Sequence, residues 1–206
     1  SPGVHLSHDV FQATILAKAT GVVAGLPVVE EVFRQVDPAV TVRLLAGDGD
    51  RITAPPQELV QISGPARAVL AGERAALNIL GHLCGVATAT RAYVERIAGT
   101  GARILDTRKT LPGLRVLDKY AVVCGGGVNH RIGLFDAILI KDNHLRVAGG
   151  VGPAVAAARS RYPDLNLTVE VETHAQVRDA VAAGAQRIML DNMSLDAMRA
   201  AVAEIA

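Results

Sequence analysis

Charged side chains follow four short apolar segments in the second half of the sequence. These charged residues are Asp106, Arg108, Lys109, Lys141, Glu170, Glu172 and Asp191. In parallel α/β proteins, ligands bind at the carboxyl ends of the strands. A single charged residue after a strand is ordinary in a loop. Charges after all four segments indicate a binding site, because unpaired charges beside an apolar core are costly.

A glycine-rich segment, Gly125–Arg131, lies between the first two apolar segments. Its three consecutive glycines allow close backbone approach and can form an anion-binding site from main-chain amides. His130 and Arg131 add donors to the same region. The alternative interpretation is a glycine-rich end of the preceding helix. Neither the P-loop pattern nor a GxGxxG motif after a strand is present, which excludes those two nucleotide sites.

The residue types in this set indicate the chemistry of the ligand. The candidate cations are Arg108, Lys109, His130, Arg131 and Lys141. Guanidinium groups bind carboxylates bidentately, whereas lysine supplies a mobile point charge, so this set favours a ligand with two or more acidic groups. The nearby carboxylates suit Mg²⁺ or sugar hydroxyls. Together these features predict an acidic ligand and a phosphorylated sugar.

Regular alternation of strands and helices after residue 100 predicts the scaffold for these side chains. The predicted strands are Ala102–Leu105, Ala137–Ile140, Leu167–Val171 and Arg187–Leu190. The predicted helices are Leu114–Val123, Pro153–Arg161, Ala175–Ala183 and a last one from Leu195 to the end. This spacing is typical of βαβ units around a parallel sheet.

The first 98 residues show no such alternation. Predicted strands at Phe11–Lys18, Val40–Leu45 and Glu58–Ser63 accompany a helix at Pro27–Val36, and a helical connector follows from residue 66 to 98 with a break at Gly81–Gly85. We therefore predict an α/β protein. A small α+β open-sandwich domain over residues 1–98 precedes a parallel βα barrel domain, with about four βα units, over residues 99–206.

Composition excludes several classes of partner. The formal net charge of +1 gives no electrostatic reason to expect nucleic acid or an anionic membrane as a partner. No apolar run approaches the ~20 residues that a membrane-spanning helix needs. Cys84 and Cys124 are too few for a disulfide framework and have no metal-binding spacing, so we expect them to be reduced. A cytoplasmic location follows as the expectation.

Several motifs resemble those of a known enzyme family. They are Glu73–Asn78, Asp106–Arg115, Lys119–Val122, Gly125–Arg131, Leu139–His144, Val169–Glu172 and Leu190–Asn192. In these stretches the sequence resembles the quinolinate phosphoribosyltransferases, also called nicotinate-nucleotide pyrophosphorylases (carboxylating). The strings TRKTLPGLR and GGGVNHR are the most specific, and the resemblance extends from about Gly21 to the last residue.

The resemblance implies a homodimer or higher homo-oligomer with shared active sites, in which quinolinate reacts with phosphoribosyl pyrophosphate. Its products are nicotinate mononucleotide, pyrophosphate and CO₂, on the route to NAD. The quinolinate carboxylates would be bound by Arg108, His130, Arg131 and Lys141, with the catalytic Lys109 nearby. Arg74 would reach in from the partner subunit. The catalytic carboxylates Glu170 and Asp191 would bind the ribose and Mg²⁺.

The resemblance also implies that the family's N-terminal helices and later phosphate-binding turns are missing, so we expect little turnover from these residues alone. Four alternatives remain open. The first is a related phosphoribosyltransferase that acts on another aromatic acid. The second is a catalytically incomplete anion-binding fragment. The third is an aldolase that forms a Schiff base at Lys109 or Lys141. The fourth is a non-catalytic anion-binding or assembly module.

Overall fold

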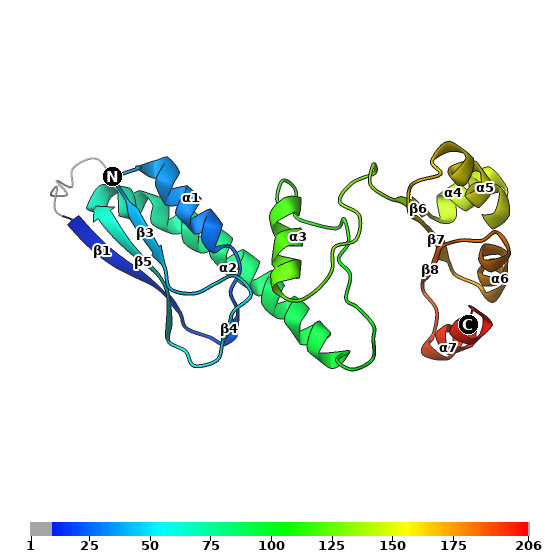
Figure 1. Cartoon of the computed structure of the whole chain (residues 1–206), viewed down its shortest axis with the longest axis horizontal. Helices are drawn as coiled ribbons and strands as arrows, with labels where there is room; N and C mark the ends of the chain where they lie inside the picture. The colour runs from blue at the N-terminus through cyan, green and yellow to red at the C-terminus, as the bar shows by residue number, and fades with distance from the viewer. Residues whose placement is uncertain (1–9, 206) are drawn as a thin grey trace. The chain divides into compact units, whose positions relative to one another are not determined.

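The computed structural model describes residues 10–205, and its contacts divide the chain into two compact units (Figure 1). The first unit runs up to His130 and the second begins at Arg131. The predicted domain boundary after residue 98 stays a prediction. Each unit is described by itself below.

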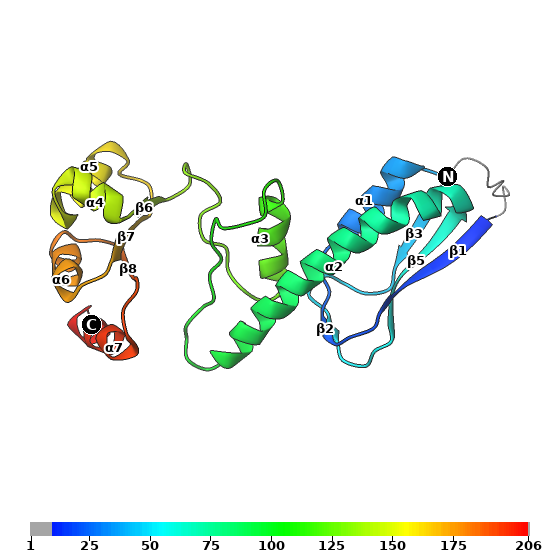
Figure 2. The ribbon, with the colours of Figure 1, turned by 180° about the vertical axis from the view of Figure 1, so that it is seen from behind.

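An antiparallel sheet covered by two helices on one face forms the body of the first unit (Figures 1 and 2). Its strands, in the order β1-β5-β3, are Val10–Ala17, Gln57–Pro65 and Thr41–Leu44. The covering helices are α1, Leu26–Val36, and α2, Ala66–Arg96. Alternate residues of β5, such as Ile62, face a core that contains Phe33 of α1 and Val69 of α2. This arrangement agrees with the predicted open sandwich.

Helix α2 is continuous, so the predicted break at Gly81–Gly85 is wrong. A Cβ atom added to either glycine would meet nothing within 4 Å, so neither position is needed for close packing or a turn. The opposite face of the helix buries Leu80, Leu83 and Ala87. Each glycine lowers helix stability by only ~1 kcal/mol, and burial of that apolar face offsets this loss.

Two short strands that the sequence did not predict complete the sandwich. Strand β2, Gly21–Val22, pairs with β4, Arg51–Ile52. Nearby, the carboxylate of Asp48 accepts hydrogen bonds from the main-chain amides of Gly25, at 2.9 Å, and Leu26, at 3.1 Å, where α1 begins. A carboxylate at this position satisfies the free amides of the helix terminus.

Helix α3, Arg115–Cys124, completes the first unit and packs against α2. The hydroxyl of Tyr120 donates to Asp48 at 2.6 Å, which ties α3 to the start of α1 and raises the pKa of Tyr120 above its ordinary range. The predicted strand Ala102–Leu105 is wrong, because only Leu105 forms a bridge, with Val128. A segment with one paired residue cannot extend a sheet ladder.

The second unit is a parallel sheet with helices. Its strands, in the order β6-β7-β8, are Ile138–Ile140, Leu167–Val171 and Arg187–Leu190. Its helices are α4, Asp142–Ala148, α5, Val151–Arg161, α6, His174–Ala182, and α7, Leu195–Ile205. The core between sheet and helices includes Val169, Val171, Val177 and Ala201. Residue 206, where the last predicted helix ends, lies outside the described residues.

The described residues contain a three-stranded parallel sheet and no closed barrel, so they hold one strand fewer than the predicted four units. The missing strand is the segment before Asp106, for the reason given above. Helix α4 directly follows β6 and was not predicted. Over residues 10–205, no helix is both long enough and apolar enough to cross a membrane.

Candidate active site

A buried ion pair between Lys119 and Asp106 organises the loops of the first unit. The Lys119 ammonium lies 2.6 Å from Oδ1 of Asp106, and the two side chains are only 3% and 6% exposed. The same Oδ1 accepts the main-chain N–H of His130 at 2.7 Å, and the Lys119 ammonium donates to the main-chain oxygen of His130 at 3.1 Å. Both polar groups of the His130 main chain are therefore bound by this pair.

Asn129 and Val128 extend the same network. With its amide oriented so that the NH₂ group faces inward, Asn129 donates to Oδ2 of Asp106 at 2.7 Å and to the main-chain oxygen of Lys119 at 3.0 Å. The amide of Val128 donates to the oxygen of Ile104 at 2.9 Å, and the amide of Asp106 donates to the oxygen of Val128 at 3.2 Å. These bonds join the segment before Arg108 to the segment that carries His130.

A second acidic residue, Asp118 in the first turn of α3, anchors the TRKTLPG loop. Its Oδ1 lies 2.6 Å from Nε2 of His82 on α2, and its Oδ2 accepts the amide of Leu111 at 3.1 Å. Asp118 is 8% exposed overall. Helices α2 and α3 thus hold the loop that carries Arg108 and Lys109.

This loop borders a small pocket of about 220 Å³, which is lined by Val86, Asp106, Thr107, Lys109, Thr110, Asp118, Lys119 and Val122. The side chain of Lys109 is exposed, and its amide donates to the hydroxyl of Thr107 at 3.0 Å. Arg108 is half-buried, and its Nε atom is buried without a hydrogen-bond partner among the described residues. A buried guanidinium donor without a partner suits an acidic ligand.

The glycines of GGGVNHR end helix α3. The amides of Gly125, Gly126 and Gly127 donate to the main-chain oxygens of Ala121, Val123 and Val122, respectively. Gly126 has a φ of 87°, and a Cβ atom on Gly125 would lie 2.4 Å from the oxygen of Ala87 on α2. The glycines therefore allow a helix end and close packing. The amides of these three glycines are already bonded, so they do not form the anion-binding site that the sequence suggested.

In the second unit, Lys141 and Glu170 lie at the carboxyl ends of neighbouring strands. Lys141 follows β6 and Glu170 lies on β7, and their charged groups are 3.3 Å apart. The Lys141 side chain is 44% exposed, so its terminal amine is accessible to solvent and to a ligand. The amide of Lys141 donates to Nδ1 of His144 at 3.0 Å, where α4 begins.

Asp191 follows β8, and its amide donates to the main-chain oxygen of Val171 at 2.9 Å. Because β7 pairs with both β6 and β8, the carboxyl ends of all three strands lie on one edge of the sheet. Glu172 lies at the same edge but is exposed, and its amide donates to the side chain of Gln176 at 2.8 Å, where α6 begins. Lys141, Glu170 and Asp191 therefore end neighbouring parallel strands, as the sequence predicted.

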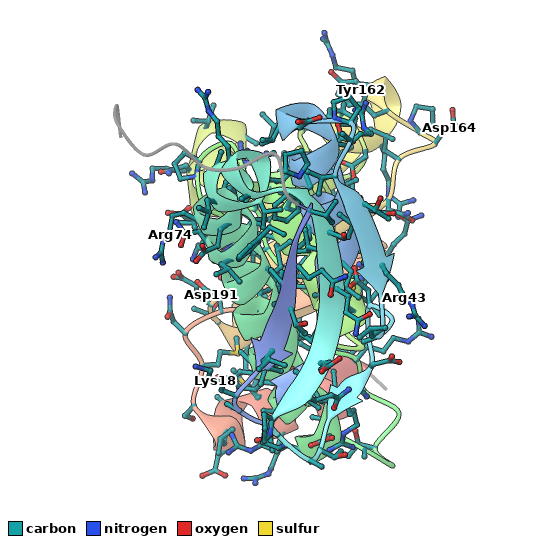
Figure 3. The ribbon with its side chains drawn as sticks, turned by 90° about the vertical axis from the view of Figure 1, so that its left-hand side faces the viewer. Lys18, Arg43, Arg74, Tyr162, Asp164 and Asp191 are labelled. Atoms are coloured by element: carbon teal, nitrogen blue, oxygen red, sulfur yellow. The ribbon has the colours of Figure 1, made fainter. Side chains whose placement is uncertain are left out.

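The remaining candidate residues have separate positions. Arg131 is half-buried, and one of its guanidinium nitrogens lies 3.4 Å from the main-chain oxygen of Ala137. Arg74 is exposed on α2, and Figure 3 shows its side chain pointing away from the strands. Within residues 10–205, no group of three or more histidine, cysteine or acidic residues could hold a metal ion. Glu170 pairs with Lys141, and Asp191 accepts a hydrogen bond from the side chain of Asn192 at 2.9 Å. Carboxylate oxygens such as these two suit a metal that takes its other ligands from a substrate and water.

Sequence reasoning missed the residues that hold the loops. Four residues hold them, and all four are buried or half-buried: Asp106, Lys119, Asp118 and His82. Asp106 was predicted only as one of the charges that follow a strand, and none of the four was predicted to hold a loop. The one available signal was Asp118 next to Lys119 within a mostly apolar helix, because buried charges need partners. Their partners lie in other segments, so the sequence could not identify them.

Comparison with known proteins identifies the class of this chain. The profile described as "Quinolinate phosphoribosyl transferase, N-terminal domain" matches residues 4–84, and the profile of the C-terminal domain of the same enzyme matches residues 86–206. Together they cover almost the whole chain and define a phosphoribosyltransferase. The chain belongs to the quinolinate phosphoribosyltransferase family, and the family resemblance seen in the sequence motifs is confirmed.

Individual relatives agree with this result. A probable nicotinate-nucleotide pyrophosphorylase (carboxylating) of Synechocystis is 46% identical over 202 residues, which cover 97% of this chain and 68% of that relative. A chloroplastic nicotinate-nucleotide pyrophosphorylase (carboxylating) of rice is 44% identical, and the match covers 88% of this chain and 51% of that relative. The structure of the nicotinate-nucleotide pyrophosphorylase from Francisella tularensis is 38% identical and has a TM-score of 0.93. The match covers 96% of this chain and 70% of that one. The chain thus spans 51% to 70% of the length of these relatives.

Proposed function

We propose that the protein carrying this chain is a nicotinate-nucleotide pyrophosphorylase (carboxylating). It transfers the phosphoribosyl group of phosphoribosyl pyrophosphate to quinolinate, with loss of CO₂, and gives nicotinate mononucleotide and pyrophosphate for NAD biosynthesis. The observation that carries the proposal is the match of both family profiles, over residues 4–84 and 86–206. The unpartnered buried donor of Arg108 supports an acidic substrate.

In this reaction, by resemblance to the family, the quinolinate carboxylates bind Arg108, His130, Arg131 and Lys141. The pyridine nitrogen attacks the anomeric carbon of the sugar as pyrophosphate leaves. The resulting positive ring nitrogen then stabilises the carbanion formed when the adjacent carboxylate departs as CO₂, and this carbanion takes up a proton from water to give nicotinate mononucleotide. Cations that hold the diacid orient it for attack, and positioning of this kind can lower a barrier by up to ~7–11 kcal/mol. No covalent nucleophile is required.

Glu170 and Asp191 are the residues we assign to the ribose and the metal. As carboxylates at neighbouring strand ends, they can accept hydrogen bonds from the ribose hydroxyls. Their negative charge can also stabilise the positive charge that develops at the anomeric carbon. When bound, Mg²⁺ would supply charge neutralisation for the departing pyrophosphate. Lys109, exposed at the edge of the small pocket, would place its ammonium close to the same negative charge. These three residues are the proposed catalytic set.

Arg74 serves a neighbouring subunit in this proposal. Its side chain is exposed on α2 and points away from the strands of its own sheet (Figure 3). A homodimer or higher homo-oligomer with shared sites would use it to bind the diacid of a partner. A mixture of chains that carry Arg74→Ala with chains that carry Lys141→Ala should recover part of the native activity. No recovery, with subunit exchange shown by mass spectrometry, would contradict sharing.

Three further proposals concern the whole protein. The parallel sheet of the second unit is part of a barrel, and the domain boundary lies after residue 98. The location is cytoplasmic, although the rice relative carries the description chloroplastic. Fractionation of cells that express the protein checks the location, and limited proteolysis around residue 98 checks the boundary.

A balanced product measurement tests the activity. The protein carrying this chain is incubated with phosphoribosyl pyrophosphate, Mg²⁺ and quinolinate labelled in the carboxyl group next to the nitrogen. We expect CO₂ and nicotinate mononucleotide in equal amounts. Nucleotide formation from another aromatic acid, without CO₂ from quinolinate, would favour a related transferase. Binding of quinolinate without any product would favour an anion-binding module, and trapping of a keto substrate by borohydride at Lys109 or Lys141 would favour an aldolase.

A further inference from the structure

The buried Asp106–Lys119 pair has no role in the proposed chemistry, since both side chains are almost entirely inaccessible. Removing two charges from water is unfavourable, and an apolar pair of the same volume is commonly as stable or more stable. Stability alone therefore does not account for a charged pair at this position. The contacts of the pair indicate a different role.

Both members of the pair bind the main chain of one residue, His130. Asp106 accepts its N–H at 2.7 Å and Lys119 donates to its oxygen at 3.1 Å. Asn129, the residue before it, donates its amide to the second oxygen of Asp106 at 2.7 Å. The main chain of His130 is therefore bound by one carboxylate and one ammonium, and the side chain of Asn129 is bound by the same carboxylate. An apolar pair could fill the same volume but could make none of these bonds.

We propose that Asp106 and Lys119 are positioning residues that fix the His130 main chain, so that the His130 imidazole is held where it binds a carboxylate of the substrate. This inference rests on the proposed function for the identity of the ligand. A fixed main chain sets the position from which the His130 side chain extends, and a binding group must be held within ~0.5 Å of its productive position. The charges of Asp106 and Lys119 cancel, so the pair fixes the His130 main chain without competing with the His130 side chain for the anion.

A double-mutant cycle tests the proposal in the full chain. Asp106→Leu combined with Lys119→Met replaces the pair by apolar side chains of similar size and avoids an unpaired buried charge. Asp106→Asn combined with Lys119→Met keeps the acceptor for the His130 N–H but loses the donor to the His130 main-chain oxygen. The matched control combines Arg178→Met with Glu204→Leu. It removes an exposed ion pair of the second unit, in which the charged groups are 3.4 Å apart. Each background is measured with and without His130→Ala.

The readout is the Kd for quinolinate by calorimetry. In the unmodified and control backgrounds, His130→Ala should weaken binding about tenfold to hundredfold, since it removes a charge-assisted hydrogen bond. In the Asp106→Leu/Lys119→Met background the further loss should be about threefold or less, because the imidazole is no longer held in place. The Asp106→Asn/Lys119→Met background should fall between the two. A full-sized His130 effect in the apolar background would overturn the proposal.

A second measurement does not depend on the ligand. Amide hydrogen exchange of His130, followed by NMR, should become at least about tenfold faster in the apolar double variant, because its N–H loses its acceptor. Exchange in β5 and β7 should stay unchanged. If no variant binds quinolinate, the proposed function fails, and the exchange rate still decides the role of the pair. Unchanged exchange at His130 would overturn it.

Discussion

The two compact units hold their candidate side chains by different means. In the first unit, Arg108 and His130 lie in irregular segments, and buried charged groups bind the main chain of these segments. In the second unit, Lys141, Glu170 and Asp191 directly follow or end paired strands, and the ion pair there is open to solvent on the lysine side. A regular hydrogen-bond ladder positions residues at strand ends, whereas loops need specific side-chain bonds.

Removal of Lys119 should produce the largest effect that this contrast predicts. Lys119→Met leaves the carboxylate of Asp106 buried without its ion-pair partner, so the free energy of unfolding should fall by ~3–5 kcal/mol. The comparison variant, Lys141→Met, breaks a half-exposed pair and should lower it by ~1 kcal/mol or less. Urea unfolding followed by circular dichroism measures both. Equal losses would contradict the difference between the units.

Lys141→Met should instead weaken ligand binding. Loss of one charge-assisted contact with a carboxylate should lower the binding free energy of quinolinate by ~1.5–3 kcal/mol. Calorimetry measures the change, and Arg146→Met, on the exposed surface of α4, provides a control with the same loss of charge. A similar loss in both variants would show that general electrostatic attraction, rather than a specific contact, binds the anion.

A smaller effect is expected at the second anchor of the first unit. Asp118→Asn keeps an acceptor for the amide of Leu111 but loses the charge that faces His82, so the unfolding free energy should fall by ~0.5–1.5 kcal/mol. Thermal unfolding at fixed pH gives this value. A loss as large as that of Lys119→Met would mean that Asp118, and not the Asp106 pair, is the main anchor of these loops.

The smallest effect concerns the two half-buried thiols of the first unit. Burial raises the pKa of Cys84 above its ordinary value, and burial also raises that of Cys124. Because the thiolate is the reactive form, both should react more slowly with iodoacetamide at pH ~8 than free cysteine does, and the rate should keep rising beyond pH ~9. Both thiols are neutral at pH ~7, so stability should not change there. Reaction as fast as in the unfolded chain would contradict burial.

The second unit was the more predictable from sequence. Strands β6, β7 and β8 and three of the helices follow from apolar segments that alternate with helical patterns. The charges at the ends of those strands could be placed on one edge because parallel strands share their direction. Helix α4 was missed because its seven residues are too few to show a clear period.

The first unit was less predictable for a physical reason. Strands β1, β3 and β5 and helix α1 were found, but β2 and β4 were missed, α2 was interrupted at its glycines and the segment before Asp106 was assigned to a strand. A local pattern cannot reveal that an apolar segment lacks a partner strand, nor that a glycine is stabilised by burial of the opposite helix face. The bonds of Lys119 join residues from separate segments, which no local pattern can predict.

Selectivity for a diacid tests the central claim most directly. Calorimetric titration of the chain with quinolinate, phthalate and nicotinate compares two diacids with a monoacid of similar shape. If Arg108, His130, Arg131 and Lys141 bind two carboxylates, both diacids should bind more tightly than nicotinate by ~1.5–3 kcal/mol. Equal affinity for nicotinate and quinolinate would contradict the assignment of these residues.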